Sequence, residues 1–360
     1  MERGIDMEKA TNKRKNQTVK RIVGIAAIPT ICLIVSLIMC ASFGTVLFKD
    51  GNSMSTYMYG TVYLTLIAFA VSINLHSGRF DFSIGATVTL TSTIVIVLAC
   101  NGCDNMGLLL FIALVSGALA GLVSGGLYLL LRLPPMICSL GVSLLYEALA
   151  YVIAGGSEQN NVIMKNQAAS GIMKAFVGAG GKSPIYLILI LVTSLAFMIV
   201  VFHYTKFGYD YRALQSGQKI AVNTGANEYL NTLLCYVISG VMTGAAGMLF
   251  GCQIQYTRVS AYLNFGTVDK MFTAFCPLFF SGLVMRYCNK QVAILISVLG
   301  YEFLQLAFGN MSAVNTTFTS TIYGIINSVI LVLFLIYLNN ENKVIEIVTL
   351  KKFLGKKQTA

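Results

Sequence analysis

Charged residues are scarce in this sequence. They make up 11% of its 360 residues, whereas about 25% is typical of soluble domains. Apolar residues account for 56% of the chain, and the mean hydropathy is +0.75. This shortage of charge excludes an ordinary soluble globular protein.

Long polar stretches and catalytic motifs are missing as well. The longest polar interruption, residues 155–183, holds 29 residues, far fewer than the roughly 100–200 of a soluble catalytic domain. A phosphate-binding loop is excluded because Phe176 stands where its first glycine would be, and neither H-E-x-x-H nor G-x-S-x-G occurs. The sequence therefore predicts no catalytic residue, no metal site and no cofactor held by this chain, and so no enzyme.

Apolar runs of membrane-spanning length occur along the whole chain. A helix of about 20 residues crosses a hydrocarbon layer of about 30 Å, and ten such runs can be placed. The sequence thus predicts an all-α fold, a polytopic helix bundle of about ten transmembrane helices surrounded by the lipid bilayer. The predicted spans are residues 22–43, 58–74, 82–100, 107–131, 135–154, 184–204, 229–251, 268–285, 291–309 and 318–338.

The net charge of +11 sits mainly at the ends of these runs and not on one face, so it does not indicate nucleic-acid binding. With ten spans, both termini lie on one side of the membrane. That side holds 19 of the 25 Lys and Arg residues, which predicts cytoplasmic termini. We expect a cytoplasmic basic arm at 1–21, a transmembrane domain at 22–338 and a cytoplasmic tail at 339–360 of a multi-pass protein of the cell membrane.

Three acidic residues fall at or near membrane depth, where an ionisable group is costly and therefore a functional candidate. They are Asp81, Glu147 and Glu302. Asp81 lies in a glycine-containing break, with Arg79 as a nearby partner. It fits either a cap at the start of the following helix or a broken helix that faces a transport cavity. Carboxylates of this kind also leave open an ion-gradient-driven secondary transporter.

Small residues recur at helical spacing in two spans. One ladder contains Ser116, Gly117, Gly121 and Gly125, and the other contains Ser239, Gly240, Gly244, Gly247 and Gly251. Close helix packing accounts for such ladders, and an inverted internal repeat is a compatible second interpretation.

Cys100 and Cys103 form a C-x-x-C at the outer end of the third predicted span. They fit a short disulfide if the outside is oxidising, whereas no second pair supports a metal site.

The segment 205–228 is the most informative polar connection. Residues 218–223 are predicted to form a short helix that begins after Gly217 and ends at Gly225. A short helix under the membrane suits docking into a groove of a soluble partner. A solvated connector is the alternative.

Four segments, in order, resemble the ribose-type (monosaccharide) permease of ATP-binding cassette (ABC) importers. These segments are Gly78-x-x-Asp81-x-Ser83-x-Gly85; Leu133-Pro134-Pro135 through Gly141; Ala154-Gly155-Gly156; and Phe207-Gly208 through Asn223-Thr224-Gly225 and on to Gly247. The sequence also departs from the family pattern in two places.

Gln218 and Lys219 stand where the family usually has acidic residues, which alters the charge offered to a partner. Residues 279–287 replace a glycine-rich stretch, which weakens any inference about the substrate.

The resemblance implies a transport subunit that imports a small polar solute, most simply a monosaccharide such as ribose. Its implied partners are a cytoplasmic ATPase subunit that holds ATP-Mg, an extracytoplasmic substrate-binding protein that meets the outer loop 155–183, and a second or related permease copy. Segment 205–228 is then the coupling loop. Its candidate ATPase-coupling residues are Gln215, Gly217, Gln218, Lys219, Ala221, Asn223 and Gly225. Hydroxyl and amide groups suit a neutral sugar, so the candidate substrate pathway is Asn74, Asp81, Ser83, Thr87 and Thr89.

Overall fold

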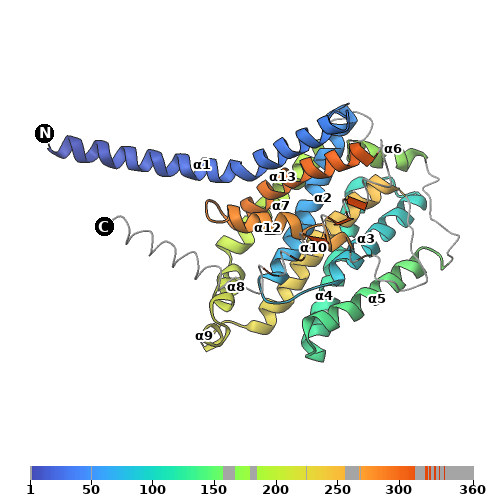
Figure 1. The fold of residues 1–360 in the computed structure, drawn as a ribbon. Helices are drawn as coiled ribbons and strands as arrows, with labels where there is room; N and C mark the ends of the chain where they lie inside the picture. Colours follow the sequence, from blue (N-terminus) through green and yellow to red (C-terminus); the bar gives the residue numbers. More distant parts are fainter. Residues whose placement is uncertain are drawn as a thin grey trace.

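The computed structural model of the chain is built of helices and contains no strand within its described residues (Figure 1). The described residues are 2–49, 51–156, 167–178, 185–223, 225–255, 267 and 269–312, with isolated positions between 321 and 336. The helices are α1 (Glu2–Ser42), α2 (Gly51–Leu75), α3 (Ser83–Cys100), α4 (Met106–Leu131), α5 (Pro135–Ile153), α6 (Gln167–Phe176), α7 (Ile185–Tyr204), α8 (Lys206–Ser216), α9 (Gln218–Asn223), α10 (Glu228–Ile254), α11 (Asp269–Phe272), α12 (Phe275–Val284) and α13 (Lys290–Ser312).

Eight of the described helices are long and apolar enough to cross a membrane: α1 from Arg21 onward, α2, α3, α4, α5, α7, α10 and α13. Most of their ends agree with the predicted spans to within a few residues. The exception is α2, which begins at Gly51, seven residues before the predicted position 58. Its first turns carry the polar residues Asn52, Ser53, Ser55 and Thr56. Because the spans were predicted from runs of apolar residues, these turns were not included in the predicted span. Helix α1 extends back to Glu2, so the predicted basic arm has a helical backbone.

The predicted span 268–285 is wrong as a single helix. The chain forms the four-residue α11 and the ten-residue α12, separated at Thr273 and Ala274. Pro277 accounts for the interruption, because it has no N–H to donate to the carbonyl of Thr273. A ten-residue helix is about 15 Å long, half of the roughly 30 Å hydrocarbon layer. The predicted tenth span, 318–338, lies largely outside the described residues.

The two small-residue ladders pack against each other. A Cβ atom added at Gly117 would collide with the backbone of Gly240 and Gly244, and one added at Gly240 would collide with Gly117. The glycines therefore let α4 and α10 approach to backbone contact, which confirms the packing interpretation. The inverted repeat stays a prediction.

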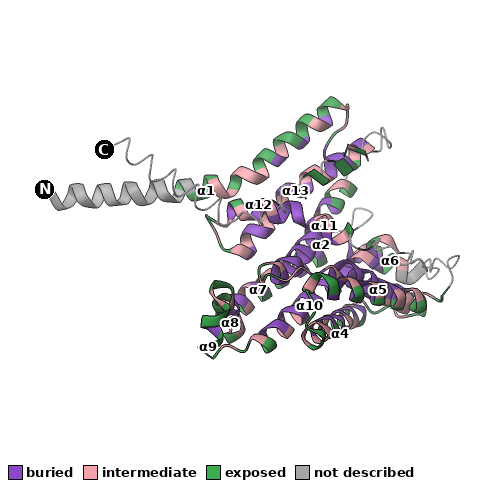
Figure 2. Cartoon of the chain, turned by 60° about the horizontal axis from the view of Figure 1, so that its bottom comes forward, coloured by how far each residue is buried: buried purple, intermediate pink, exposed green. Residues whose placement is uncertain are grey.

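Burial divides the helices into an inner and an outer set. Helices α2, α3 and α10 have 72%, 78% and 67% of their most apolar windows buried, whereas α1, α4 and α7 have 11%, 28% and 22% (Figure 2). The outer helices expose large apolar side chains such as Leu130 on α4 and Val192 on α7. Such faces suit hydrocarbon, as expected for an integral membrane protein.

Candidate functional site: a helical connection and two polar regions

The connection between α7 and α10 is a pair of helices. Helix α9 covers Gln218–Asn223, which confirms the predicted bounds. Helix α8, Lys206–Ser216, was not predicted, although two signals for it are present. The hydroxyl of Thr205 accepts a hydrogen bond from the Gly208 N–H as an N-cap. In addition, Phe207, Tyr211 and Leu214 share the spacing of one helix face.

Gly217 and Gly225, the two glycines at the ends of α9, differ in whether their backbone conformation requires glycine. Gly225 has a φ of +97° and follows the end of α9. This is backbone that favours glycine, so the predicted helix stop is confirmed. Gly217 has an extended φ of 176°, and an added Cβ would come no nearer than 3.6 Å to Ile220. The fold itself therefore tolerates a larger residue at Gly217.

Helix α9 turns apolar side chains outward. Ala221 is 3% exposed, whereas Ile220 is 73% and Val222 is 45% exposed. Among the other candidate coupling residues, Gln215, Gln218, Lys219, Asn223 and Gly225 are exposed and Gly217 is half-buried. The structure thus gathers these residues on one accessible protrusion (Figure 1).

Hydrogen bonds tie this protrusion to two spanning helices. The Tyr211 hydroxyl donates to the carbonyl of Ile73 at 2.8 Å, and Gln215 Nε2 donates to the carbonyl of His76 at 3.0 Å. Gln218 Nε2 donates to the carboxylate of Glu228 at 2.6 Å. Helices α8 and α9 are therefore linked by side-chain hydrogen bonds to the end of α2 and the start of α10.

Asn74, Asp81 and Ser83 form one buried cluster. Asp81 Oδ2 accepts from Asn74 Nδ2 at 3.0 Å, and Asp81 Oδ1 accepts from the N–H and the hydroxyl of Ser83 at 3.0 and 2.6 Å. Because Ser83 is the first residue of α3, the aspartate satisfies a backbone N–H at the helix start, as the cap interpretation predicted. The expected Arg79 partner is wrong, since Arg79 donates to the hydroxyl of Thr232 instead.

The cluster continues into α4 and α5. The Ser83 hydroxyl lies 3.4 Å from that of Ser124, which lies 2.8 Å from the Tyr146 hydroxyl. Four spanning helices therefore meet through one polar network. Asp81 adjoins a cavity of only about 10 Å³, which is too small for a sugar.

Thr87 and Thr89, the remaining pathway candidates, bond to their own helix. Their hydroxyls donate to the carbonyls of Ser83 and Gly85 at 2.9 and 3.1 Å. Thr89 also accepts from Lys270 Nζ at 2.8 Å, which holds α11 against α3.

The three membrane acids lie in separate environments. Asp81 has the partners above, and Glu147 accepts from the N–H and hydroxyl of Thr267. Within the described part of the chain, no three His, Cys, Asp or Glu residues gather as a metal site would require. Cys100 and Cys103 are half-buried thiols.

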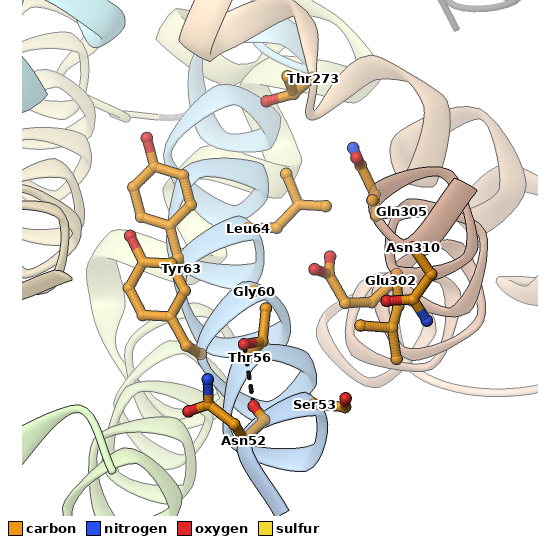
Figure 3. A pocket seen from close by; sticks show the side chains of 13 residues that line it. Asn52, Ser53, Thr56, Gly60, Tyr63, Leu64, Thr273, Glu302, Gln305 and Asn310 are labelled. Atoms are coloured by element: carbon orange, nitrogen blue, oxygen red, sulfur yellow. Dashed lines mark hydrogen bonds between the residues drawn. The ribbon is translucent and has the colours of Figure 1, made fainter. Parts of the chain in front are cut away.

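The third acid, Glu302, faces a cavity of about 550 Å³ between α2 and α13 (Figure 3). The lining residues are Asn52, Ser53, Thr56, Tyr59, Gly60, Tyr63, Leu64, Thr273, Glu302, Gln305, Leu306, Gly309 and Asn310. Glu302 was predicted as a functional candidate, but the α2 side of the lining was not, because the predicted span begins at residue 58 and α2 begins at Gly51. The missed signal is the helical spacing of Asn52, Thr56, Gly60 and Tyr63, which puts a polar stripe on one face.

The family described as "Branched-chain amino acid transport system / permease component" matches residues 53–350. The chain belongs to this family. The matched residues, 53–350, include most of the described helices of this permease.

Curated relatives agree with that assignment. The autoinducer 2 import system permease protein LsrC of Enterobacter sp. (strain 638) is 27% identical over 225 residues, 61% of this chain and 63% of that protein. The fructose import permease protein FruG of Bifidobacterium longum (strain NCC 2705) is 25% identical over 242 residues, 63% and 68% of the two chains. The galactose/methyl galactoside import permease protein MglC of Escherichia coli (strain K12) is 24% identical over 255 residues, 67% and 73%.

The chain thus spans 63–73% of the length of these relatives. They are named as transport components and not as enzymes. No solved structure matches the permease.

Proposed function

We propose that the permease is the membrane subunit of an ABC importer and translocates a small polar solute, most simply a monosaccharide such as ribose. The relatives support a sugar-like cargo, since their names specify autoinducer 2, fructose and galactose or methyl galactoside. An extracytoplasmic binding protein delivers the solute to the outer loop 155–183, and a second or related permease copy completes the pathway. In this proposal both termini are cytoplasmic, and the broken pair α11 and α12 takes the place of the single helix expected over residues 268–285.

The observation that carries this proposal is the exposed helix α9. Ile220 and Val222 would each be costly to leave in water, because a buried Val or Ile side chain is worth about 1.5–3 kcal/mol, yet both are exposed. A groove on a cytoplasmic ATPase subunit, which binds ATP-Mg, would cover them. Gln218 and Lys219 lie on the same protrusion and contribute neutral and basic groups to that contact.

The hydrogen bonds from α8 and α9 connect α9 mechanically to the spanning helices α2 and α10. When the ATPase subunits close on ATP, they push α9, and the push reaches α2 through Tyr211 and Gln215 and reaches α10 through Gln218. Asn74 lies on the same end of α2 and holds Asp81. The movement is therefore transmitted to the start of α3, beside the predicted substrate pathway.

Replacing Ile220 with Asp tests the docking role. We expect ATP-driven uptake by the permease, reconstituted with its ATPase and binding protein, to fall about tenfold or more, because a charge would enter an apolar contact. The matched control is Val19→Asp, since Val19 is 49% exposed and lies on the predicted cytoplasmic arm, away from α9 in the sequence. Unchanged uptake in the Ile220 variant would contradict the proposal.

The same vesicles separate the proposal from an ion-driven carrier. An importer stops when the ATPase subunit is left out. Uptake that continues without the ATPase and stops when the proton gradient is collapsed would instead identify a secondary transporter.

A further inference from the structure

The cavity between α2 and α13 opens at the end of the permease remote from α9. Asn52 and Ser53 stand in the first turn of α2, and Asn310 stands in the last turn of α13. The other end of α2 is the end that contacts α8. In the proposed orientation, a solute arriving from outside therefore meets the mouth of this cavity first.

Glu302 lies on the wall of the cavity, on the α13 side. Its side chain is 9% exposed and extends from α13 toward α2 (Figure 3). Within the described residues, its carboxylate has neither a hydrogen bond nor an ion pair. A buried carboxylate without a donor is expensive, so a bound molecule that supplies O–H donors would relieve that cost.

Gly60 makes room for this carboxylate. A Cβ atom at position 60 would collide with the carboxylate of Glu302. The glycine thus lets the Glu302 carboxylate lie directly against α2, on the wall of the cavity.

Several polar groups of the wall keep a free acceptor oxygen, while the hydroxyls of Ser53, Tyr59 and Tyr63 can donate or accept. The hydroxyls of Thr56 and Thr273 donate to backbone carbonyls of their own segments, which leaves their oxygen lone pairs for a ligand. Gln305 Nε2 donates to the Tyr301 hydroxyl, and Asn310 Nδ2 donates to the carbonyls of Val46 and Leu47. The amide oxygens of Gln305 and Asn310 remain as acceptors, beside the carboxylate of Glu302.

An aromatic surface completes the lining. The rings of Tyr59 and Tyr63 are nearly parallel, with centroids 5.8 Å apart and an interplanar angle of 10°. Aromatic faces pack against the C–H groups of a sugar ring, while acceptors take its hydroxyl protons. The lining residues include no Lys, Arg or His, so an anion would meet no cationic side chain among them. The volume of about 550 Å³ is in the range of small-molecule sites.

We propose that this cavity binds a neutral polyhydroxylated molecule of monosaccharide size, inside a single permease subunit, with Glu302 as the main acceptor. This inference rests on the proposed function, since it names where an imported sugar is held. The site is separate from the Asp81 cluster.

Direct binding to the purified full-length permease in lipid nanodiscs tests the site. Saturation-transfer NMR with D-ribose, D-galactose and D-fructose should show contact with at least one of these sugars, whereas D-gluconate should show none. Glu302→Ala should weaken that contact roughly tenfold or more, the effect of losing one or two hydrogen bonds to the carboxyl group. Gly60→Leu should abolish it by filling the cavity.

Gly126→Leu is the matched control, because Gly126 lies on α4 with open space around it. Its sugar contact should equal that of the unchanged permease. If Gly60→Leu fails to fold, Glu302→Gln keeps the side-chain shape and should still weaken binding. Equal binding by the unchanged permease and the Glu302 variants would overturn the inference, and so would preference for gluconate or for a small amine such as ethanolamine.

ATP-driven uptake measured with the same variants separates the two proposals. Uptake that requires the ATPase, together with unaltered binding and transport in the Glu302 and Gly60 variants, would reject the cavity site alone. Uptake that does not require the ATPase would reject the proposed function, whatever the cavity binds.

Discussion

At the scale of single residues, the buried acids show what a sequence can and cannot disclose. The glycine-flanked break around Asp81 indicated a cap, and Asp81 does accept from the first N–H of α3. The hydrogen-bond donor to Asp81 could not be predicted from the sequence. Arg79 is closer to Asp81 along the chain than Asn74 is, but it bonds to Thr232 on α10, and Asn74 donates to Asp81 instead. Glu302 faces a cavity only because Gly60 lies opposite on another helix, and no local pattern encodes that contact.

Asp81→Ala should destabilise the permease strongly. It removes three hydrogen bonds and leaves Asn74 and Ser83 buried without their acceptor, at a cost of about 2 kcal/mol or more. Thermal unfolding in detergent should show a clearly lower midpoint. Thr87→Val is the contrast, since Thr87 bonds only within its own helix. A midpoint unchanged by Asp81→Ala would count against the structural role of the cluster.

At the scale of elements, periodicity predicted the long helices and failed where polar residues or proline interrupt it. Helix α9 was found with its glycine boundaries, whereas α8 was missed despite its cap and its aromatic face. The broken pair α11 and α12 looked like one apolar span because hydropathy does not register the missing N–H of Pro277.

Gly117→Leu should separate α4 from α10. The added side chain meets the backbone of Gly240 and Gly244, which cannot rotate away, and overpacking of this kind costs about 1–3 kcal/mol or more. We expect reduced accumulation in the membrane and a lower unfolding midpoint. Gly126→Leu on the same helix should have little effect. Equal behaviour of the two variants would argue that the ladder is not a packing surface.

At the scale of the whole molecule, the two ends of α2 have different surroundings. One end is bonded to α8, and the other lines the cavity with Glu302. The sequence placed both regions in the membrane domain, but the link between them depends on contacts across more than 130 positions, as between Tyr211 and Ile73. Such long-range pairs follow from the folded arrangement and not from local spacing.

Removing the bonds from α8 to α2 should uncouple ATP hydrolysis from transport. Tyr211→Phe combined with Gln215→Ala deletes both donors, and we expect the ratio of solute imported to ATP hydrolysed to fall several-fold. Tyr209→Phe is the matched control, because Tyr209 is 59% exposed on the same helix. An unaltered ratio in the double variant would show that the push takes another route.

The break between α11 and α12 has a consequence for water. Helix ends within the hydrocarbon layer leave backbone polar groups that lipid cannot satisfy, and irregular backbone is tolerated at that depth only where it is packed in protein or lines a wet space. Thr273 stands at the break and borders the Glu302 cavity. The N–H groups of Thr273 and Ala274 are bonded within the chain, so water in that cavity would serve the Thr273 carbonyl, which Pro277 leaves without a helical donor.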